Sequence, residues 1–163
     1  MPFVNFIREV MKVWYWNRIN RIRGFKRFFR KEEKMSIEKF LRIEKGKIYL
    51  KAINGTWKRF DNVLGDILCQ KDVKLKQRRF RVNGIFADGG CWMGRDGDEI
   101  WIYAKLSQEE KEKTLIHEIL EDHFVDDVDV MGNNEDLIEE ITKKIWENKK
   151  CRKEIRDVLS VIQ

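Results

Sequence analysis

The spacing of the apolar residues along the chain changes at Ser107. Just before it, Ile100 and Ile102 alternate with other residues, which is typical of a β-strand. Beyond it, apolar residues recur at the spacing of an α-helix as far as about Phe124, at Leu115, Ile116, Ile119 and Leu120. Ser107 followed by Glu110 has the form of a capping box, so we expect the helix to begin there. Strand patterns followed by helix patterns predict the α+β class.

The residues before Ser107 predict a small antiparallel sheet packed beside this helix. Asn54-Gly55 separates two strand-like runs, 47–53 and 56–60, and this dipeptide is the strongest short signal for a hairpin. We expect a short helix capped by Ser36, a strand over 79–86, a turn over the Gly- and Asp-rich residues 89–98, and a last strand over 99–103. Two further helices are expected at the C-terminal end, the first beginning near Asn134.

Residues 1–34 differ in charge from the rest of the chain. They hold ten Lys and Arg against three Asp and Glu, which gives a net charge of +7, whereas the whole chain has a net charge of +6. Their apolar residues follow a helical period over 3–16, so we expect a basic helical extension to a domain at 35–163. Such an arm suits nucleic acid, an anionic membrane surface or a protein partner, unless its apolar face packs on the core. The candidate nucleic-acid-binding residues are Arg18, Arg21, Arg23, Lys26, Arg27 and Arg30.

Composition excludes several classes of protein. The three cysteines are far apart in sequence, which argues against a disulfide framework or a cysteine-based zinc site and favours reduced thiols in a cytoplasmic protein. No run of about 18 apolar residues is present, and the first residues lack the pattern of a secretory signal. We therefore expect no transmembrane segment. The abundance of Lys and Glu is typical of proteins from hot environments.

The segment 107–147 is the acidic counterpart of the arm, with fourteen Asp and Glu against four Lys and Arg, and it contains both histidines. His117 is followed by Glu118, and Glu121 lies four residues after His117, a spacing that places the two side chains on one helix face. In an H-E-x-x-H helix, two histidines at this spacing hold a metal and the glutamate acts as general base. The second histidine here is His123, six residues on, about 240° further round an ideal helix.

Residues 84–147 resemble the zincin-like metallopeptidases of phages and archaeal mobile elements. The matching features are a strand with Gly84, the strand Ile100-Trp101-Ile102, the sequence Leu106-Ser107-Gln108-Glu109-Glu110, the helix with Thr114-Leu115-Ile116-His117-Glu118-Ile119-Leu120, and the acidic start of the next helix at 134–141. The departure from the family pattern is Glu121, which stands where the second histidine is expected.

The resemblance implies a role for each residue of the motif. His117 would be a metal ligand, Glu118 the general base and Glu121 a substitute ligand, or His123 if the helix ends before it. A glutamate of the next helix would be the third ligand, with Glu139 as first choice and Glu135 as second. The implied cofactor is zinc, although one His and two carboxylates also suit Mn²⁺.

Three functional hypotheses stay open at this stage. The first is a metal-dependent peptidase that acts on a peptide or protein, and the second is a degenerate relative that binds no metal. The third is a non-enzymatic protein that keeps the zincin-like scaffold and binds nucleic acid or a partner through residues 1–34. The motif itself has a plain alternative, in which His117 is a polar residue on a helix flank and the acidic side chains form a solvated face.

Overall fold

The computed structural model describes residues 36–162, apart from 53, 83–84, 95–96 and 125–134. The chain divides into two compact units, Met1–Lys34 and Met35–Gln163, and the second is described below. The expected basic helical arm and its six candidate nucleic-acid-binding residues lie outside the described residues. The cap of the helix expected from Asn134 lies outside them as well.

The described part begins with a three-stranded antiparallel sheet in the order β1-β2-β3. The elements are the 3-10 turn η1 (Ile37–Lys39), β1 (Leu41–Glu44), β2 (Lys47–Lys51) and β3 (Trp57–Arg59). The hairpin predicted at Asn54-Gly55 is confirmed, because Lys51 pairs with Trp57 across it. β1 was not expected from the sequence, and it joins β2 through a tight turn in which Lys45 and Gly46 both have positive φ.

Helix α2 (Phe60–Gln70) follows β3 directly and was also not expected from the sequence. Its buried residues recur at helical spacing and form one face, made of Phe60, Val63, Leu64 and Ile67. The helix leads straight into β4 (Lys71–Lys76), whose Val73 and Leu75 pack against the core.

The second sheet has the order β4-β8-β7 and is mixed, since β8 runs parallel to β4 and antiparallel to β7. Its other strands are β7 (Gly89–Gly94) and β8 (Gly97–Tyr103). The turn predicted over 89–98 was therefore wrong, because most of this segment forms paired strands. The single strand predicted over 79–86 was wrong too, since β5 (Phe80–Val82) and β6 (Ile85–Ala87) form a separate antiparallel hairpin.

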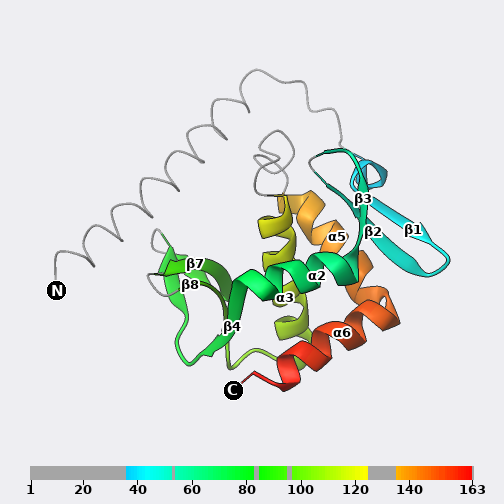
Figure 1. Cartoon of the computed structure of the whole chain (residues 1–163). Coiled ribbons are helices and arrows are strands. Elements are labelled where there is room, and N and C mark those ends of the chain that lie inside the picture. The colour runs from blue at the N-terminus through cyan, green and yellow to red at the C-terminus, as the bar shows by residue number, and fades with distance from the viewer. Residues whose placement is uncertain (1–35, 53, 83–84, 95–96, 125–134, 163) are drawn as a thin grey trace. The chain divides into compact units, whose positions relative to one another are not determined.

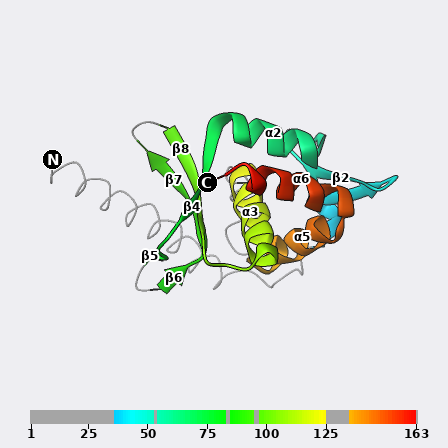
Figure 2. The same ribbon diagram turned by 90° about the horizontal axis from the view of Figure 1, so that it is seen from below.

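Three helices complete the fold, namely α3 (Gln108–His123), α5 (Glu135–Glu147) and α6 (Lys149–Ser160). The capping box of α3 is confirmed, because Ser107 accepts a hydrogen bond from the backbone of Glu110 and the Glu110 side chain accepts one in return. Figures 1 and 2 show α3 in the middle of the described unit, between the β4-β8-β7 sheet and helices α5 and α6. The predicted α+β class is confirmed. None of the described helices is long and apolar enough to cross a membrane.

The hydrophobic core surrounds α3. Ile100 and Ile102 of β8 are 0 % exposed, and so are the four apolar residues of α3 that the sequence pattern predicted. Helices α5 and α6 close the core from the other side with their own apolar stripes, formed by Leu137, Ile138, Ile141 and Ile145 in α5 and by Cys151, Ile155 and Leu159 in α6. Because α3 is covered on several sides, its polar residues are held in fixed positions.

A buried carboxylate connects the three C-terminal helices. Glu112 of α3 is 0 % exposed. It accepts hydrogen bonds from Gln108 one turn earlier, from Trp146 Nε1 of α5 at 2.9 Å and from Arg156 Nε of α6 at 2.7 Å. Burial alone would raise the pKa of Glu112, but these hydrogen bonds, with that from Arg156 strongest, hold it below its ordinary value. Glu112 is therefore ionised and fixes α5 and α6 against α3.

We predict that Glu112→Ala destabilises the protein by about 2 kcal/mol, because the half-buried Trp146 indole loses its acceptor and the ion pair of a fully buried carboxylate with Arg156 is removed. The free energy of unfolding is measured by urea denaturation followed by circular dichroism. Glu109→Ala is the matched control, since Glu109 lies on the same helix but forms only an exposed ion pair with Lys113, and we expect it to change the stability by less than about 0.5 kcal/mol. Equal effects of the two substitutions would contradict the proposed role of Glu112.

Candidate metal centre

The candidate site lies on the face of α3 that turns toward α5. His117 and Glu121 are one turn apart, and His117 Nε2 lies 3.2 Å from Glu121 Oε1. Leu115, Ile116 and Ile119 are fully buried, so the orientation of the helix is fixed by its apolar residues. The structure thus brings together the two residues that the four-residue spacing places on one face.

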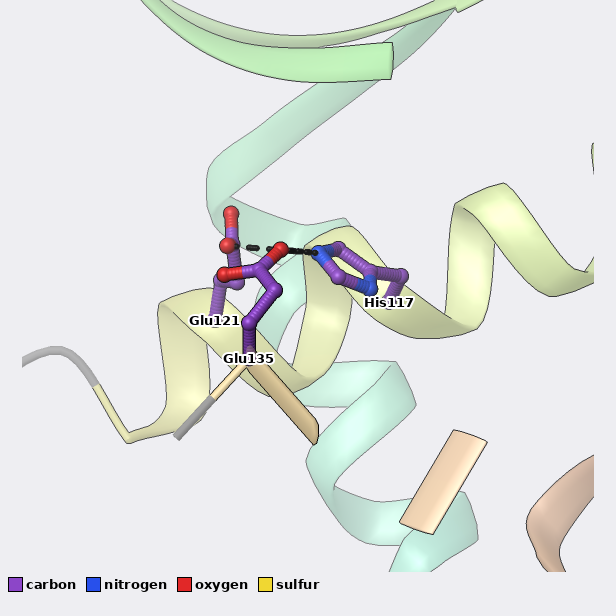
Figure 3. Close-up of side chains that lie close together, drawn as sticks. All are labelled: His117, Glu121 and Glu135. Carbon is purple, nitrogen blue, oxygen red and sulfur yellow. Dashed lines mark hydrogen bonds and ion pairs between the residues drawn. The ribbon is translucent and has the colours of Figure 1, made fainter. Parts of the chain in front are cut away.

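Helix α5 contributes two more carboxylates to the same ring. His117 Nε2 lies 3.4 Å from Glu135 Oε1, and His117 Nδ1 lies 2.9 Å from Glu139 Oε1. The buried side of α5 fixes these positions, because Ile138 and Ile141 pack into the core and turn the two glutamates toward α3. Figure 3 shows His117, Glu121 and Glu135 converging from the two helices.

Three of these residues have the spacing of ligands of one cation. His117, Glu121 and Glu135 each offer one atom, and the three atoms all lie within 4.8 Å of one another. Glu139 meets the opposite ring nitrogen, which is the position of the carboxylates that orient metal-bound histidines. The structure therefore favours Glu135 over Glu139 as the third ligand, although the sequence ranked them in the reverse order. The assignment of all the ligands stays a prediction.

The carboxylates around His117 change its acid–base behaviour. Its side chain is 16 % exposed, and this burial by itself disfavours the charged ring. Hydrogen bonds to Glu121 and Glu135, together with the negative charges nearby, outweigh the burial and raise the pKa of His117 to about 11. In the metal-free protein the ring is therefore an imidazolium that neutralises part of the acidic cluster.

Glu118 follows His117 by one residue, about 100° further round α3, and its side chain points toward β7 of the second sheet. It is 5 % exposed, and its Oε2 lies 3.6 Å from the Cys91 sulfur on β7, whose thiol donates a hydrogen bond to it. Burial, followed by the negative charge of Glu121, raises the pKa of Glu118 to about 8. Burial and the Glu118 carboxylate also raise the pKa of the Cys91 thiol, so the sulfur stays protonated at neutral pH.

Strand β7 approaches α3 closely at Gly89. A Cβ atom at this position would lie 2.3 Å from Thr114 Cγ2 and 3.0 Å from Glu118 Oε1, too close for any side chain to fit without movement. The colliding atom is the methyl group of Thr114, so the contact is relieved only if Thr114 changes its χ1 rotamer or β7 moves outward. The bare backbone of Gly89 therefore lies directly over the carboxylate of Glu118.

The structure places His123 away from the cluster. Its Nε2 lies 3.0 Å from the backbone oxygen of Lys51 on β2, and its ring packs edge-on against Phe124. Burial lowers the pKa of His123, so it is neutral at pH 7 and can donate one hydrogen bond to that oxygen. Helix α3 continues as far as His123, so the helical unwinding needed to bring this side chain to His117 does not occur.

Two residues of the site were missed from the sequence, Gly89 and Cys91 on β7. The segment around them was predicted as a turn, because its glycines carry no alternating apolar pattern. The signal that could have identified them is the pairing partner: Ile100 and Ile102 belong to a clear strand, and their neighbours in the register are Cys91 and Gly89.

No family model, curated protein or solved structure matches this chain. The resemblance to zincin-like peptidases therefore stays a prediction carried by residues 84–147.

The pKa of Glu118 leads to a prediction about stability and pH. Its folded-state pKa of about 8 lies above the ordinary value of 4.5, so the folded protein holds a proton that the unfolded chain releases. The contribution of Glu118 to the free energy of unfolding is therefore fully present below pH 4.5, and it is lost as the pH rises through 8. In EDTA, we expect the unfolding free energy of the parent protein to fall between pH 5 and pH 8 more steeply than that of Glu118→Gln, by about 1 kcal/mol per pH unit.

The comparison with Glu118→Gln isolates the contribution of this one carboxyl group. His117 also loses stabilisation as the pH rises, between its ordinary pKa of 6.5 and about 11, but it does so in both proteins. Urea denaturation at five pH values measures the two slopes. Parallel slopes would mean that Glu118 ionises with an ordinary pKa, and therefore that it is not buried as described.

Proposed function

We propose that this chain is a zincin-like metal-dependent peptidase, in which His117, Glu121 and Glu135 hold one divalent cation and Glu118 is the general base. The observation that carries the proposal is the convergence of three ligand atoms within 4.8 Å, from two different helices. A buried glutamate next to His117 in sequence supports it, because a metallopeptidase needs a base beside its first ligand.

The donor atoms fit a divalent cation. One imidazole nitrogen and two carboxylate oxygens are acceptable to zinc, and the share of oxygen makes manganese more competitive than at a two-histidine site. A bound cation would replace the proton of His117 as the positive charge among the carboxylates. Because the ring must lose that proton first, we expect binding to strengthen as the pH rises.

The residues of the chain have separate tasks in this proposal. A bound cation would polarise the peptide carbonyl and lower the pKa of the attacking water. Glu118 would take the proton of that water and pass it to the leaving amine, for which a carboxyl pKa near neutral pH is suitable. Glu139 would be a positioning residue, since its Oε1 lies 2.9 Å from Nδ1 of His117 and leaves Nε2 for the cation.

The two glutamates of α5 can be told apart by their metal affinities. We predict that Glu135→Gln weakens zinc or manganese binding by about 100-fold or more, because it removes a ligand. Glu139→Gln should weaken it by only about tenfold, because an outer ion pair with the ligand His117 is lost. Glu140→Gln is the matched control, an exposed glutamate of the same helix outside the cluster. Isothermal titration calorimetry of the full chain with each metal measures the three constants.

A larger loss in Glu139→Gln than in Glu135→Gln would reverse the assignment of ligand and positioning residue. If the parent protein binds neither metal at pH 8, the metal centre itself is wrong and the degenerate hypothesis is favoured.

Activity gives an independent prediction for Glu118. Glu118→Gln should reduce hydrolysis of a denatured protein substrate by a factor of about 100 to 10,000, because an amide cannot accept the proton of the water. Its metal affinity should stay within about threefold of the parent, since Glu118 is not a ligand. Cleavage is followed by release of soluble peptides, with the EDTA-treated parent as the blank. Full activity in the variant would remove Glu118 from its proposed role.

A second candidate function is a non-enzymatic binding protein on the same scaffold. One observation favours it: both nitrogens of His117 already lie against carboxylates, so the cluster is neutralised in part without any metal. In that case the ion pairs would hold α3 and α5 together, and binding would depend on other surfaces, including the basic residues 1–34. Metal titration separates the two candidates, because only the first requires a divalent cation.

A further inference from the structure

The outer face of the β4-β8-β7 sheet carries a row of basic and aromatic side chains. Ile100 and Ile102 of β8 are buried on the side of α3, so Trp101 and Tyr103 belong to the opposite face. The parallel register pairs Lys74 with Trp101 and Lys76 with Tyr103, which places two lysines of β4 beside two aromatic residues of β8. In Figure 2, α3 lies on one side of β4 and β8, and the β5–β6 hairpin lies on the other.

The basic residues lie over the aromatic rings. Lys76 Nζ is 4.5 Å from the ring centre of Trp101, and the Arg79 guanidinium is 4.8 Å from that of Tyr103. In the hairpin, the Arg81 guanidinium lies 4.6 Å from the ring of Phe86, which is 56 % exposed. Three cation–aromatic pairs thus extend from the sheet onto the hairpin, and we call these six residues the outer face.

The charge of this region is positive. Residues 74–81 contain five Lys and Arg, and the described residues of β4, β8 and the adjoining loop contain four carboxylates, Asp72, Asp88, Asp98 and Glu99. Alternation along β8 places Asp98 on the side of Ile100 and Ile102, away from this face. Lys74 pairs with Glu99, and Arg79 pairs with Asp88. Within the described part of the chain, Lys76 and Arg81 form no ion pair with a carboxylate, and each lies over an aromatic ring instead.

We infer that the outer face binds single-stranded nucleic acid. Proteins that hold single strands without sequence preference combine Lys and Arg along the phosphate backbone with aromatic rings on which bases stack. The outer face has both, with cations and rings alternating over two adjacent strands and a hairpin. A duplex keeps its bases stacked on one another, so it would use the cations but not the rings.

The outer face is distinct from the candidate metal centre, because the sheet separates it from His117 and Glu118 of α3. A negative result for nucleic-acid binding would therefore leave the proposed peptidase function untouched. A negative result for metal binding or hydrolysis would likewise leave the proposed nucleic-acid binding untouched.

The test compares two triple variants of the full chain that lose the same charge. The first is Lys76→Gln with Arg79→Gln and Arg81→Gln on the outer face. The second is Lys144→Gln with Lys149→Gln and Lys153→Gln, three exposed lysines of α5 and α6. Binding of a fluorescein-labelled oligodeoxythymidine of about twenty nucleotides, long enough for one such site, is measured by fluorescence anisotropy at four salt concentrations.

We expect the outer-face variant to bind the oligonucleotide at least tenfold more weakly than the parent, and the helix variant to stay within about threefold. The dependence of log Kd on log salt should become shallower by about 2 in the outer-face variant, since each lost phosphate contact removes about 0.7. Phe86→Leu should weaken binding about fivefold or more, because it removes a stacking ring but keeps an exposed apolar side chain. Circular dichroism melting confirms that each variant is folded.

Several results would overturn the inference. One is an equal loss in the two triple variants, which would reduce the effect to overall charge. Another is a parent protein that does not bind the oligonucleotide at low salt, or that binds duplex DNA more tightly. A third is binding that depends only on the arm, shown by a loss in Arg18→Gln with Arg21→Gln and Arg23→Gln and by none in the outer-face variant. Binding to phosphatidylserine vesicles alone would assign the face to a membrane surface instead.

Discussion

The described fold depends on the buried carboxylate of Glu112. Its side chain lies on the buried side of α3, and its two carboxylate oxygens accept hydrogen bonds from Gln108 of the same helix, Trp146 of α5 and Arg156 of α6. Apolar packing fixes the distance between two helices, but it fixes their relative position along the helix axis, the axial offset, less well. One helix can shift by a turn along the other and still pack similar side chains together. A directed hydrogen bond from the indole of Trp146 fixes that offset. The position of Glu135 and Glu139 relative to the His117 ring follows from it.

The acidic character of α3 and α5 opposes folding at the place where it would serve chemistry. Three glutamates lie against one imidazole and Glu118 is the next residue on the same helix, and their mutual repulsion is relieved in the metal-free protein by a protonated ring and, at Glu118, by a retained proton. A sequence selected only for stability would replace some of these residues by neutral ones. If the cluster is the proposed metal centre, it is a cost of function more than a support of the fold, which is the usual relation between stability and a charged site.

The sequence predicts the features that depend on near neighbours in the chain. The α3 cap at Ser107, the face shared by His117 and Glu121, the Asn54-Gly55 hairpin and the α+β class all arise from local spacing. It does not predict features that arise from distant partners. β7 is a strand because β8 offers it a pairing edge, and its glycines give no pattern of their own. The choice between Glu135 and Glu139 is of the same kind, since both lie on the α5 face toward α3 and only the helix offset decides which ring nitrogen each one meets.

The close contact at Gly89 means that substitutions at positions 89 and 114 should be correlated between related sequences. An added methyl group would lie 2.3 Å from Thr114 Cγ2, so the strand would have to move outward, or the threonine would have to change its rotamer or be replaced by a smaller residue. In any homologous sequence, alanine at position 89 should therefore occur together with alanine or serine at position 114, whereas threonine at 114 should occur with glycine at 89. Such paired substitution would preserve the spacing between a sheet edge and a helix without changing either element.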